Sequence, residues 1–121
     1  MNGYFDIALN LASDRFLGDR EKVIANAISH NVNFFNIVCS SIDELDFVKD
    51  LNSRFRENSC FTLGVHPHNA DELNEDNLQS LKDSIKMHHP SAVGETGLDF
   101  FRNLSSFCLL YTSPSPRDDL W

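Results

Sequence analysis

Four short apolar runs alternate along the chain with three amphipathic segments. The first run, residues 4–11 (YFDIALNL), has the two-residue spacing of a strand. The second, residues 33–39 (NFFNIVC), is continuous, which is typical of a strand buried on both faces. Two further runs follow at residues 60–66 (CFTLGVH) and 91–101 (SAVGETGLDFF). The pattern therefore predicts four strands.

The segments between these runs carry apolar residues at helical spacing. Residues 19–30, 45–55 and 75–88 each place their apolar side chains on one stripe, which predicts three helices. Ser41 and Glu44 have the spacing of a capping box, with Ser41 at the N-cap and Glu44 three residues later. We therefore expect the middle helix to begin next to Ser41.

The predicted order is β-α-β-α-β-α-β, and this alternation is typical of right-handed βαβ units with a parallel sheet. Two architectures fit it: a doubly wound sheet, or the first half, about four βα units, of a (β/α)₈ barrel. In both of them, ligands bind at the carboxyl ends of the strands. The search for functional residues therefore concentrates on that edge.

Composition and charge limit the classes of protein that remain. The chain has 121 residues, of which 41% are hydrophobic, enough for one small domain. Its formal net charge of −8 makes it a poor non-specific binder of nucleic acid, so such a role needs a metal ion or a local basic patch. No apolar stretch approaches the ~20 residues of a membrane span. The N-terminus lacks the basic segment of a signal peptide, and the three cysteines form no C-x-x-C pair. We therefore expect a cytoplasmic protein.

Polar side chains follow three of the predicted strands at their carboxyl ends. On the first strand, two-residue spacing places Asp6, Ala8 and Asn10 on one face. The proline of the H-P-H segment holds the histidine before it extended and bars a helix there, so that both histidines project alike. Gly94 and Gly97 let a backbone or a ligand approach the fourth strand end closely. The candidate functional residues are Asn10, His66, His68, Glu95 and Asp99.

Carboxylate, imidazole and amide groups together suit a divalent metal such as Mg, Mn or Zn. Such an ion can polarise a phosphoryl or carbonyl oxygen and lower the pKa of bound water toward ~7. Each residue also has a structural interpretation: His66 and His68 as a surface turn, Glu95 as an acceptor for backbone amides, and Asn10 and Asp99 as caps. Their meeting at one edge favours a joint site.

Three segments, DIALNL, GVHPHNAD and AVGETGLDFFRN, resemble in order and separation the TatD family of metal-dependent deoxyribonucleases. Sequences of that family carry a D-x-[H or G]-x-[H or N]-L opening, a G-[VIC]-H-P-H segment and a G-E-x-G-L-D-[YF] segment. The resemblance covers residues 4–107. It implies a TIM-barrel, metal-dependent hydrolase that cleaves DNA phosphodiester bonds with metal-activated water. It implies one or two divalent ions, with Mg favoured and Mn or Zn as alternatives.

The resemblance also implies roles for individual residues. Glu95 would be a catalytic metal ligand that bridges two ions, and Asn10 would take the place of the second histidine of an H-x-H ligand pair. Ala8 stands where the first histidine would be, and alanine cannot bind a metal. His66 would be catalytic through contact with substrate phosphate. His68 and Asp99 would join it in the rim of the active site.

The chain departs from the family in length, because a (β/α)₈ barrel needs ~250 residues. Two histidines and an aspartate that the family supplies from its second half are absent. The match ends near residue 107, and CLLYTSPSPRDDLW resembles translated adapter sequence. We therefore expect residues 1–107 to be the first part of a barrel domain and residues 108–121 to be a disordered or artefactual tail.

Two alternatives to a deoxyribonuclease remain open at this stage. A barrel metallohydrolase with the same residues could act on a small phosphoester, lactone or amide. The 121-residue chain could also be an inactive fragment without a catalytic role, because half the ligands are missing and both edge strands would be exposed.

Overall fold

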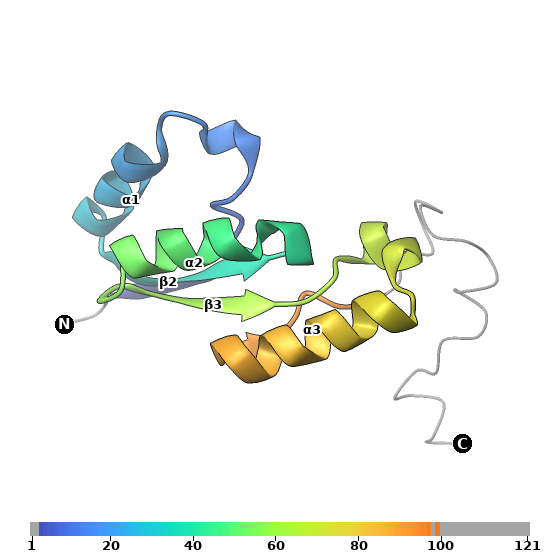
Figure 1. Cartoon of the computed structure of the whole chain (residues 1–121). Helices are drawn as coiled ribbons and strands as arrows, with labels where there is room; N and C mark the ends of the chain where they lie inside the picture. The colour runs from blue at the N-terminus through green and yellow to red at the C-terminus, as the bar shows by residue number, and fades with distance from the viewer. Residues whose placement is uncertain (1–2, 98, 100–121) are drawn as a thin grey trace, which may run out of the picture.

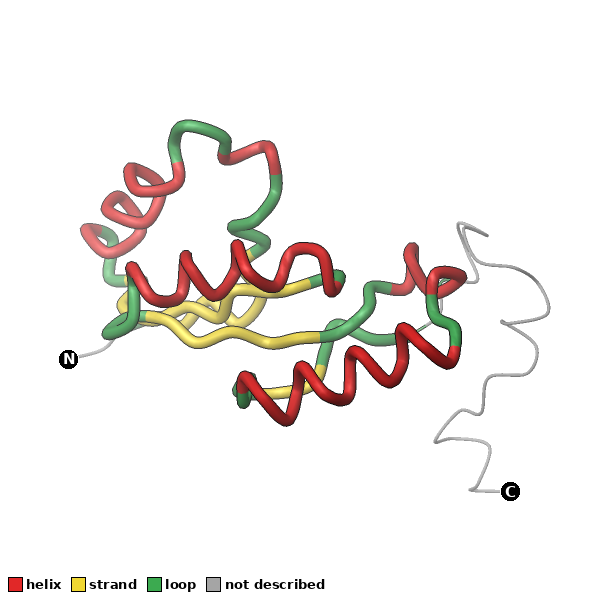
Figure 2. Tube along the Cα trace, in the orientation of Figure 1, coloured by secondary structure: helices red, strands yellow, loops and turns green. Residues whose placement is uncertain are grey.

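A computed structural model of the chain describes residues 3–97 and 99 (Figures 1 and 2). The predicted boundary between residues 1–107 and the tail at 108–121 lies outside the described residues. Three short 3₁₀ helices join the main elements: η1 (Asp14–Phe16), η2 (Ile42–Glu44) and η3 (Pro67–Glu72). The predicted helices and strands all occur, as β1 (Tyr4–Leu9), α1 (Arg20–Ser29), β2 (Val32–Cys39), α2 (Leu45–Arg54), β3 (Ser59–Leu63), α3 (Glu75–His88) and β4 (Ala92–Val93).

The four strands form one parallel sheet in the order β1-β2-β3-β4. Each strand therefore lies beside the strand that follows it in the sequence. A doubly wound sheet reverses its strand order at a switch point, whereas a (β/α)₈ barrel adds each strand next to the last. The observed order therefore favours the barrel.

The hydrophobic core lies between one face of the sheet and all three helices. Alternate residues of β2 and β3 point to this face, among them Phe35, Ile37 and Leu63. They pack with apolar side chains from each helix, namely Ile24 of α1, Leu45, Val48 and Leu51 of α2, and Leu81 of α3. Helices on a single face, together with sequential strand order, make this the first half of a TIM (β/α)₈ barrel. The predicted α/β fold class is confirmed.

The start of α2 differs in detail from the predicted capping box. Ser41 is the N-cap of η2, but its hydroxyl makes no capping hydrogen bond. The Glu44 carboxylate instead accepts from the backbone N–H of Ser40 at 3.0 Å, and α2 begins at Leu45. Neither bond of the predicted capping box is therefore formed, because Glu44 bonds to the residue before the N-cap and a 3₁₀ turn separates Ser41 from α2. None of the helices in the described part is long and apolar enough to span a membrane.

Cys39, the last residue of β2, gives the fold a testable dependence on alkaline pH. Its side chain is fully buried, and this burial raises the pKa of the thiol from 9.0 to about 11. Below pH 9 the thiol is protonated in both the folded and the unfolded chain. Above pH 9 the thiol of the unfolded chain loses its proton first. The free energy of unfolding should therefore fall by about 2–3 kcal/mol between pH 9 and pH 11.

The measurement is urea unfolding of the native chain and of Cys39→Val across that pH range. Valine keeps most of the buried volume and cannot ionise, so subtracting its profile removes the contribution of the other titrating groups. We expect the difference between the two profiles to grow above pH 9. Two profiles that stay parallel to pH 11 would show that the Cys39 thiol does not ionise on unfolding.

Candidate active site at the carboxyl edge of the sheet

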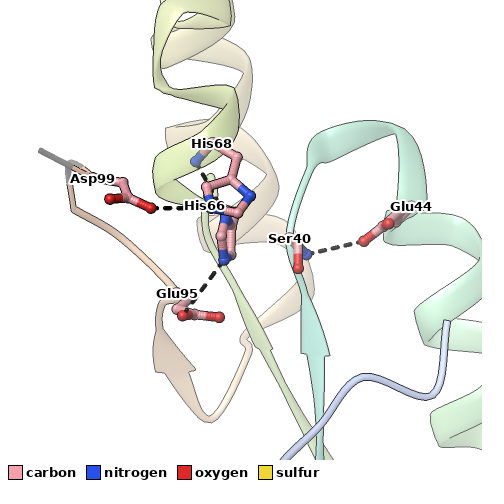
Figure 3. Close-up of polar contacts among 6 residues, drawn as sticks. All are labelled: Ser40, Glu44, His66, His68, Glu95 and Asp99. Carbon is pink, nitrogen blue, oxygen red and sulfur yellow. Dashed lines mark hydrogen bonds and ion pairs between the residues drawn. The ribbon is translucent and has the colours of Figure 1, made fainter. Parts of the chain in front are cut away.

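The structure brings four of the five predicted site residues together. His66 and His68 follow β3, while Glu95 and Asp99 follow β4, and Figure 3 shows these four side chains as neighbours. Adjacent parallel strands end at the same edge of a sheet, which explains why the two segments meet. Asn10 follows β1, on the opposite edge strand of the sheet. Its role as a metal ligand stays a prediction.

His66 is fixed in place by backbone contacts on both sides. Its N–H donates to the carbonyl of Ser40 at 2.9 Å, which extends the pairing of β2 with β3 past the strand ends. Its backbone is extended, as predicted, with φ −58° and ψ 145°. The prediction that the proline bars a helix is wrong, because η3 begins at Pro67. Proline fits the first position of a helix, where no backbone N–H is needed.

The ring of His66 has a defined tautomer. Its Nδ1 accepts from the backbone N–H of His68 at 3.1 Å, which makes His66 the side-chain N-cap of η3. An accepting Nδ1 carries no proton, so the neutral ring has its proton on Nε2. Nε2 faces the Glu95 carboxylate, with 3.7 Å between Nε2 and Oε1 (Figure 3). His66 therefore presents an N–H donor to the site rather than a lone pair.

The Glu95 carboxylate remains open to a ligand. The 3.7 Å separation from His66 is longer than a hydrogen bond, and 57% of the Glu95 side chain is exposed. Within the described residues, no backbone amide donates to this carboxylate, which argues against the purely structural interpretation of Glu95. The Glu95 carboxylate, which can act as an oxygen ligand for a metal ion, therefore faces solvent beside the Nε2–H of His66.

His68 and Asp99 form a second pair beside the first. His68 Nε2 donates to Asp99 Oδ2 at 3.2 Å, and most of the Asp99 side chain is shielded from solvent. The His68 ring also packs edge-on against the His66 ring, with 4.3 Å between the ring centroids. Asp99 thus orients His68, and His68 supports His66 through both its backbone N–H and its ring.

A close backbone approach at Gly64 sets the position of Glu95. A Cβ atom added to Gly64 would lie 2.5 Å from the carbonyl oxygen of Glu95 and 2.6 Å from the carbonyl carbon of Gly94. The predicted positions for a close approach are Gly94 and Gly97 instead. A Cβ on Gly94 would meet nothing within 4 Å. Gly97 has a φ of +142°, a backbone conformation that residues with a side chain rarely adopt, so glycine is needed there for its conformation. In the sequence, Gly64 of the GVHPH segment is the residue that could have predicted this close contact.

Asn36 is a further residue whose role the sequence did not predict, although it is a polar residue inside the apolar run at residues 33–39. It is 8% exposed and lies on the face of the sheet away from the helices. Its Nδ2 donates to the carbonyl of Ile7 at 3.1 Å and to the Thr62 hydroxyl at 3.3 Å. This one side chain therefore ties β1 and β3 to β2.

The contact to Ile7 lies where the pairing of β1 with β2 is irregular. Asp6 pairs with Phe35 and Leu9 with Ile37, so β1 has one more residue than β2 over this step. The Asp6 carboxylate accepts from the N–H of Ala8 at 3.1 Å inside the same irregularity. Strict two-residue spacing therefore fails here, and with it the argument that put Asp6, Ala8 and Asn10 on one face.

The donors at this edge suit a divalent metal in type but are few in number. The described residues include no group of three or more His, Cys, Asp or Glu side chains placed to hold a metal ion. They supply two pairs, Glu95 with His66 and Asp99 with His68, while divalent ions usually take four to six ligands. The described side chains therefore suit a divalent metal in type and are too few to surround one by themselves.

Comparison with known proteins gives a consistent match over this region. The family model described as TatD related DNase matches residues 5–109. A protein of Pantoea ananatis (strain LMG 20103) is 38% identical over 102 residues, covering 84% of this chain and 39% of the relative. A protein of Dickeya dadantii (strain 3937) is 35% identical over 102 residues, with the same two coverages. Both relatives are named 3'-5' ssDNA/RNA exonuclease TatD.

The chain spans about two fifths of the length of the curated relatives that it matches. The matched segment contains the four strands, except for the first residue of β1, and the Glu95–His66 and His68–Asp99 pairs. Since the family model covers most of the chain, the chain belongs to the TatD related DNase family.

Proposed function

We propose that the protein to which this chain belongs is a metal-dependent nuclease that hydrolyses phosphodiester bonds of single-stranded DNA or RNA. The observation that carries the proposal is the solvent-facing Glu95 carboxylate beside the Nε2–H of His66, at the carboxyl edge of a half-barrel. The names of the relatives from Pantoea ananatis and Dickeya dadantii support this substrate class.

Glu95 is the residue that we assign to metal binding. Its carboxylate is anionic, exposed and not hydrogen-bonded to His66, so it can bind an ion without breaking a bond of the fold. Mg²⁺ suits such an oxygen donor best, with Mn²⁺ or Zn²⁺ as alternatives and one or two ions at the site. When bound, the metal supplies a lowered pKa for coordinated water and positive charge for the phosphate. Asn10 adds a neutral amide oxygen in this proposal.

His66 is assigned to the substrate rather than to the metal. Its Nδ1 is occupied by the His68 N–H, which leaves Nε2–H as a donor for a phosphate oxygen. A donor already aligned by the fold stabilises charge that develops on the phosphoryl oxygens in the transition state. His68 and Asp99 hold the His66 ring in this orientation.

The free thiols Cys39 and Cys60 fit a reducing compartment, and we place the protein in the cytoplasm.

The test is a chimaera in which residues 4–99 of this chain replace the residues aligned with them in the Pantoea ananatis relative, so that the relative supplies the rest of a full-length barrel. We expect divalent-metal-dependent hydrolysis of end-labelled single-stranded DNA or RNA, abolished by EDTA. A folded chimaera that hydrolyses only small phosphoesters, lactones or amides would contradict the proposed substrate. A folded chimaera without any hydrolysis would contradict an active site built on Glu95 and His66.

Two substitutions of His66 separate its structural role from its chemical one. His66→Asn keeps a side-chain acceptor suited to an N-cap, whereas His66→Phe loses both the cap and the Nε2–H. In the chimaera we expect His66→Asn to lower kcat/KM about 10²-fold with near-native stability. His66→Phe should lose activity to a similar extent and also about 1 kcal/mol of stability. Kinetics on single-stranded DNA and urea unfolding measure the two effects. Full activity of the His66→Asn variant would show that the His66 side chain takes no part in the reaction.

A further inference from the structure

The side chains of β1 change face partway along the strand. The Phe5 ring contacts the Phe34 ring, with 5.2 Å between the centroids, and Phe34 shares with Asn36 the face of the sheet away from the helices. Leu9 and, just after the strand, Leu11 pack instead against the core on the helix side. In a regular strand residues 5, 9 and 11 would all point to one face. The alternation of β1 therefore reverses between Phe5 and Leu9.

The extra residue of β1 accounts for this reversal. The strand takes three residue steps from Asp6 to Leu9, while its neighbour β2 takes two from Phe35 to Ile37. A shift of one residue in register moves all following side chains to the opposite face of the sheet. The irregularity thus lets Leu9 reach the core after Phe5 has faced away from it.

The same reversal decides where Asn10 points. Asn10 lies between two residues that pack into the core, and its own side chain is exposed, so it faces away from the helices. On β3, Leu63 and Val65 pack into the core, so the alternation places His66 on the face away from the helices as well. Without the extra residue of β1, Asn10 would point to the helix side, away from the face that His66 shares.

Side chains hold both polar groups of one peptide unit inside the irregularity. The Ile7 carbonyl accepts from Asn36 Nδ2 at 3.1 Å, and the N–H of Ala8, in the same peptide unit, donates to the Asp6 carboxylate at 3.1 Å. The bond from Asp6 is exposed, whereas Asn36 is 8% exposed.

Asn36 is itself anchored on β3. Its Nδ2 also donates to the Thr62 hydroxyl at 3.3 Å, and its Oδ1 accepts from the Cys60 thiol at 3.5 Å. A buried amide with partners on both of its polar atoms has a fixed orientation. Asn36 is therefore the firmer of the two supports of the Ile7–Ala8 peptide unit.

We propose that Asn36 is a positioning residue for the metal site. By holding the Ile7 carbonyl it keeps the extra residue of β1 in place, and this turns Asn10 to the face on which His66 lies. The inference rests on the proposed function, in which the amide oxygen of Asn10 joins the Glu95 carboxylate at the metal. Asn36 acts through Asn10 and contacts neither the metal nor the substrate.

The experiment is Mn²⁺ binding to the full-length chimaera, followed by electron paramagnetic resonance of the free ion. Asn36→Leu keeps the size of the side chain and removes its bond to Ile7, so we expect the Kd for Mn²⁺ to rise about tenfold. Thr62→Val is the matched control, because it removes the other acceptor of Asn36 Nδ2 and leaves the bond to Ile7. Its Kd should stay close to the native value. Equal Kd values for the two variants would overturn the proposal.

A double-mutant cycle tests whether Asn36 acts through Asn10. Asn10→Ala should weaken Mn²⁺ binding, and adding Asn36→Leu to it should weaken binding no further, since the residue that Asn36 positions is already absent. Additive losses of affinity would show that Asn36 does not act through Asn10, and would overturn the proposal.

Deleting Ile7 tests the geometry even if Asn36→Leu alone does not fold. A strand without Ile7 has no extra residue between Asp6 and Leu9, so Leu9 stays opposite Ile37 in a regular ladder. Deletion of Ile7 in the Asn36→Leu chimaera should therefore restore folding and most of the Mn²⁺ affinity. A deletion that restores neither would contradict the role assigned to Asn36.

These measurements separate the inference from the proposed function, because Mn²⁺ affinity is measured without nucleic acid. A chimaera that binds Mn²⁺ but leaves single-stranded DNA and RNA intact would contradict the proposed function alone. An active chimaera whose Mn²⁺ affinity is unchanged by Asn36→Leu would contradict the positioning role alone.

Discussion

Replacing Glu95 with glutamine in the chimaera is expected to lower kcat/KM on single-stranded DNA by about 10³-fold. Glutamine keeps the size of the side chain and removes the negative charge that we assign to metal binding. Because 57% of the Glu95 side chain is exposed, the free energy of unfolding should change by less than about 0.5 kcal/mol. Steady-state kinetics at several Mg²⁺ concentrations should show that excess metal restores little of the activity.

Glu75→Gln is the control for this substitution. Glu75 is an exposed glutamate in the first turn of α3 and is not among the predicted site residues, so its replacement removes the same charge from a residue without an assigned role. We expect its kcat/KM to stay within twofold of the native chimaera. Equal activity of the Glu95→Gln and Glu75→Gln variants would show that the Glu95 carboxylate has no part in the reaction.

The second large effect is expected from Gly64→Ala, a change that adds one methyl group. The added Cβ would lie 2.5 Å from the Glu95 carbonyl oxygen, so the segment after β4 must move away from β3. Forcing a group into such a packed contact costs about 1–3 kcal/mol of stability. The displacement also carries Glu95 away from His66, so we expect kcat/KM of the chimaera to fall about 10²-fold.

Gly94→Ala provides the comparison, because a Cβ there would meet nothing within 4 Å. Both variants are measured by urea unfolding and by nuclease kinetics. We expect Gly94→Ala to keep native stability within about 0.5 kcal/mol. If Gly64→Ala were as stable and as active as Gly94→Ala, the close approach of the two strand ends would not be what places Glu95.

Local pattern was sufficient to predict the elements of this fold and their order. The stripes on α1, α2 and α3 and the apolar runs of the strands depend on residues within a few positions of each other, so periodicity reveals them. The pattern of apolar and polar residues alone could not distinguish a doubly wound sheet from half of a (β/α)₈ barrel. The choice depended on which face of the sheet each helix covers, and contacts such as those of Ile24 and Leu81 with the same core decide it.

The candidate site shows where sequence reasoning reaches its limit. Placing His66, His68, Glu95 and Asp99 together needed only the rule that parallel strands end at a common edge. The tautomer of His66 depends on one hydrogen bond within η3. The irregularity of β1 lies where a side chain almost thirty residues away, Asn36, donates to the Ile7 carbonyl. Neither contact leaves a periodic signal.

The most direct test of the central claim is the crystal structure of the full-length chimaera with Mn²⁺, located by anomalous scattering. We predict a metal ion within about 2.2 Å of a Glu95 carboxylate oxygen. We also predict that His66 Nδ1 still accepts from the His68 N–H and that its Nε2 does not touch the ion. A metal bound elsewhere, with Glu95 free of it, would contradict the assignment of this edge as the metal-dependent active site.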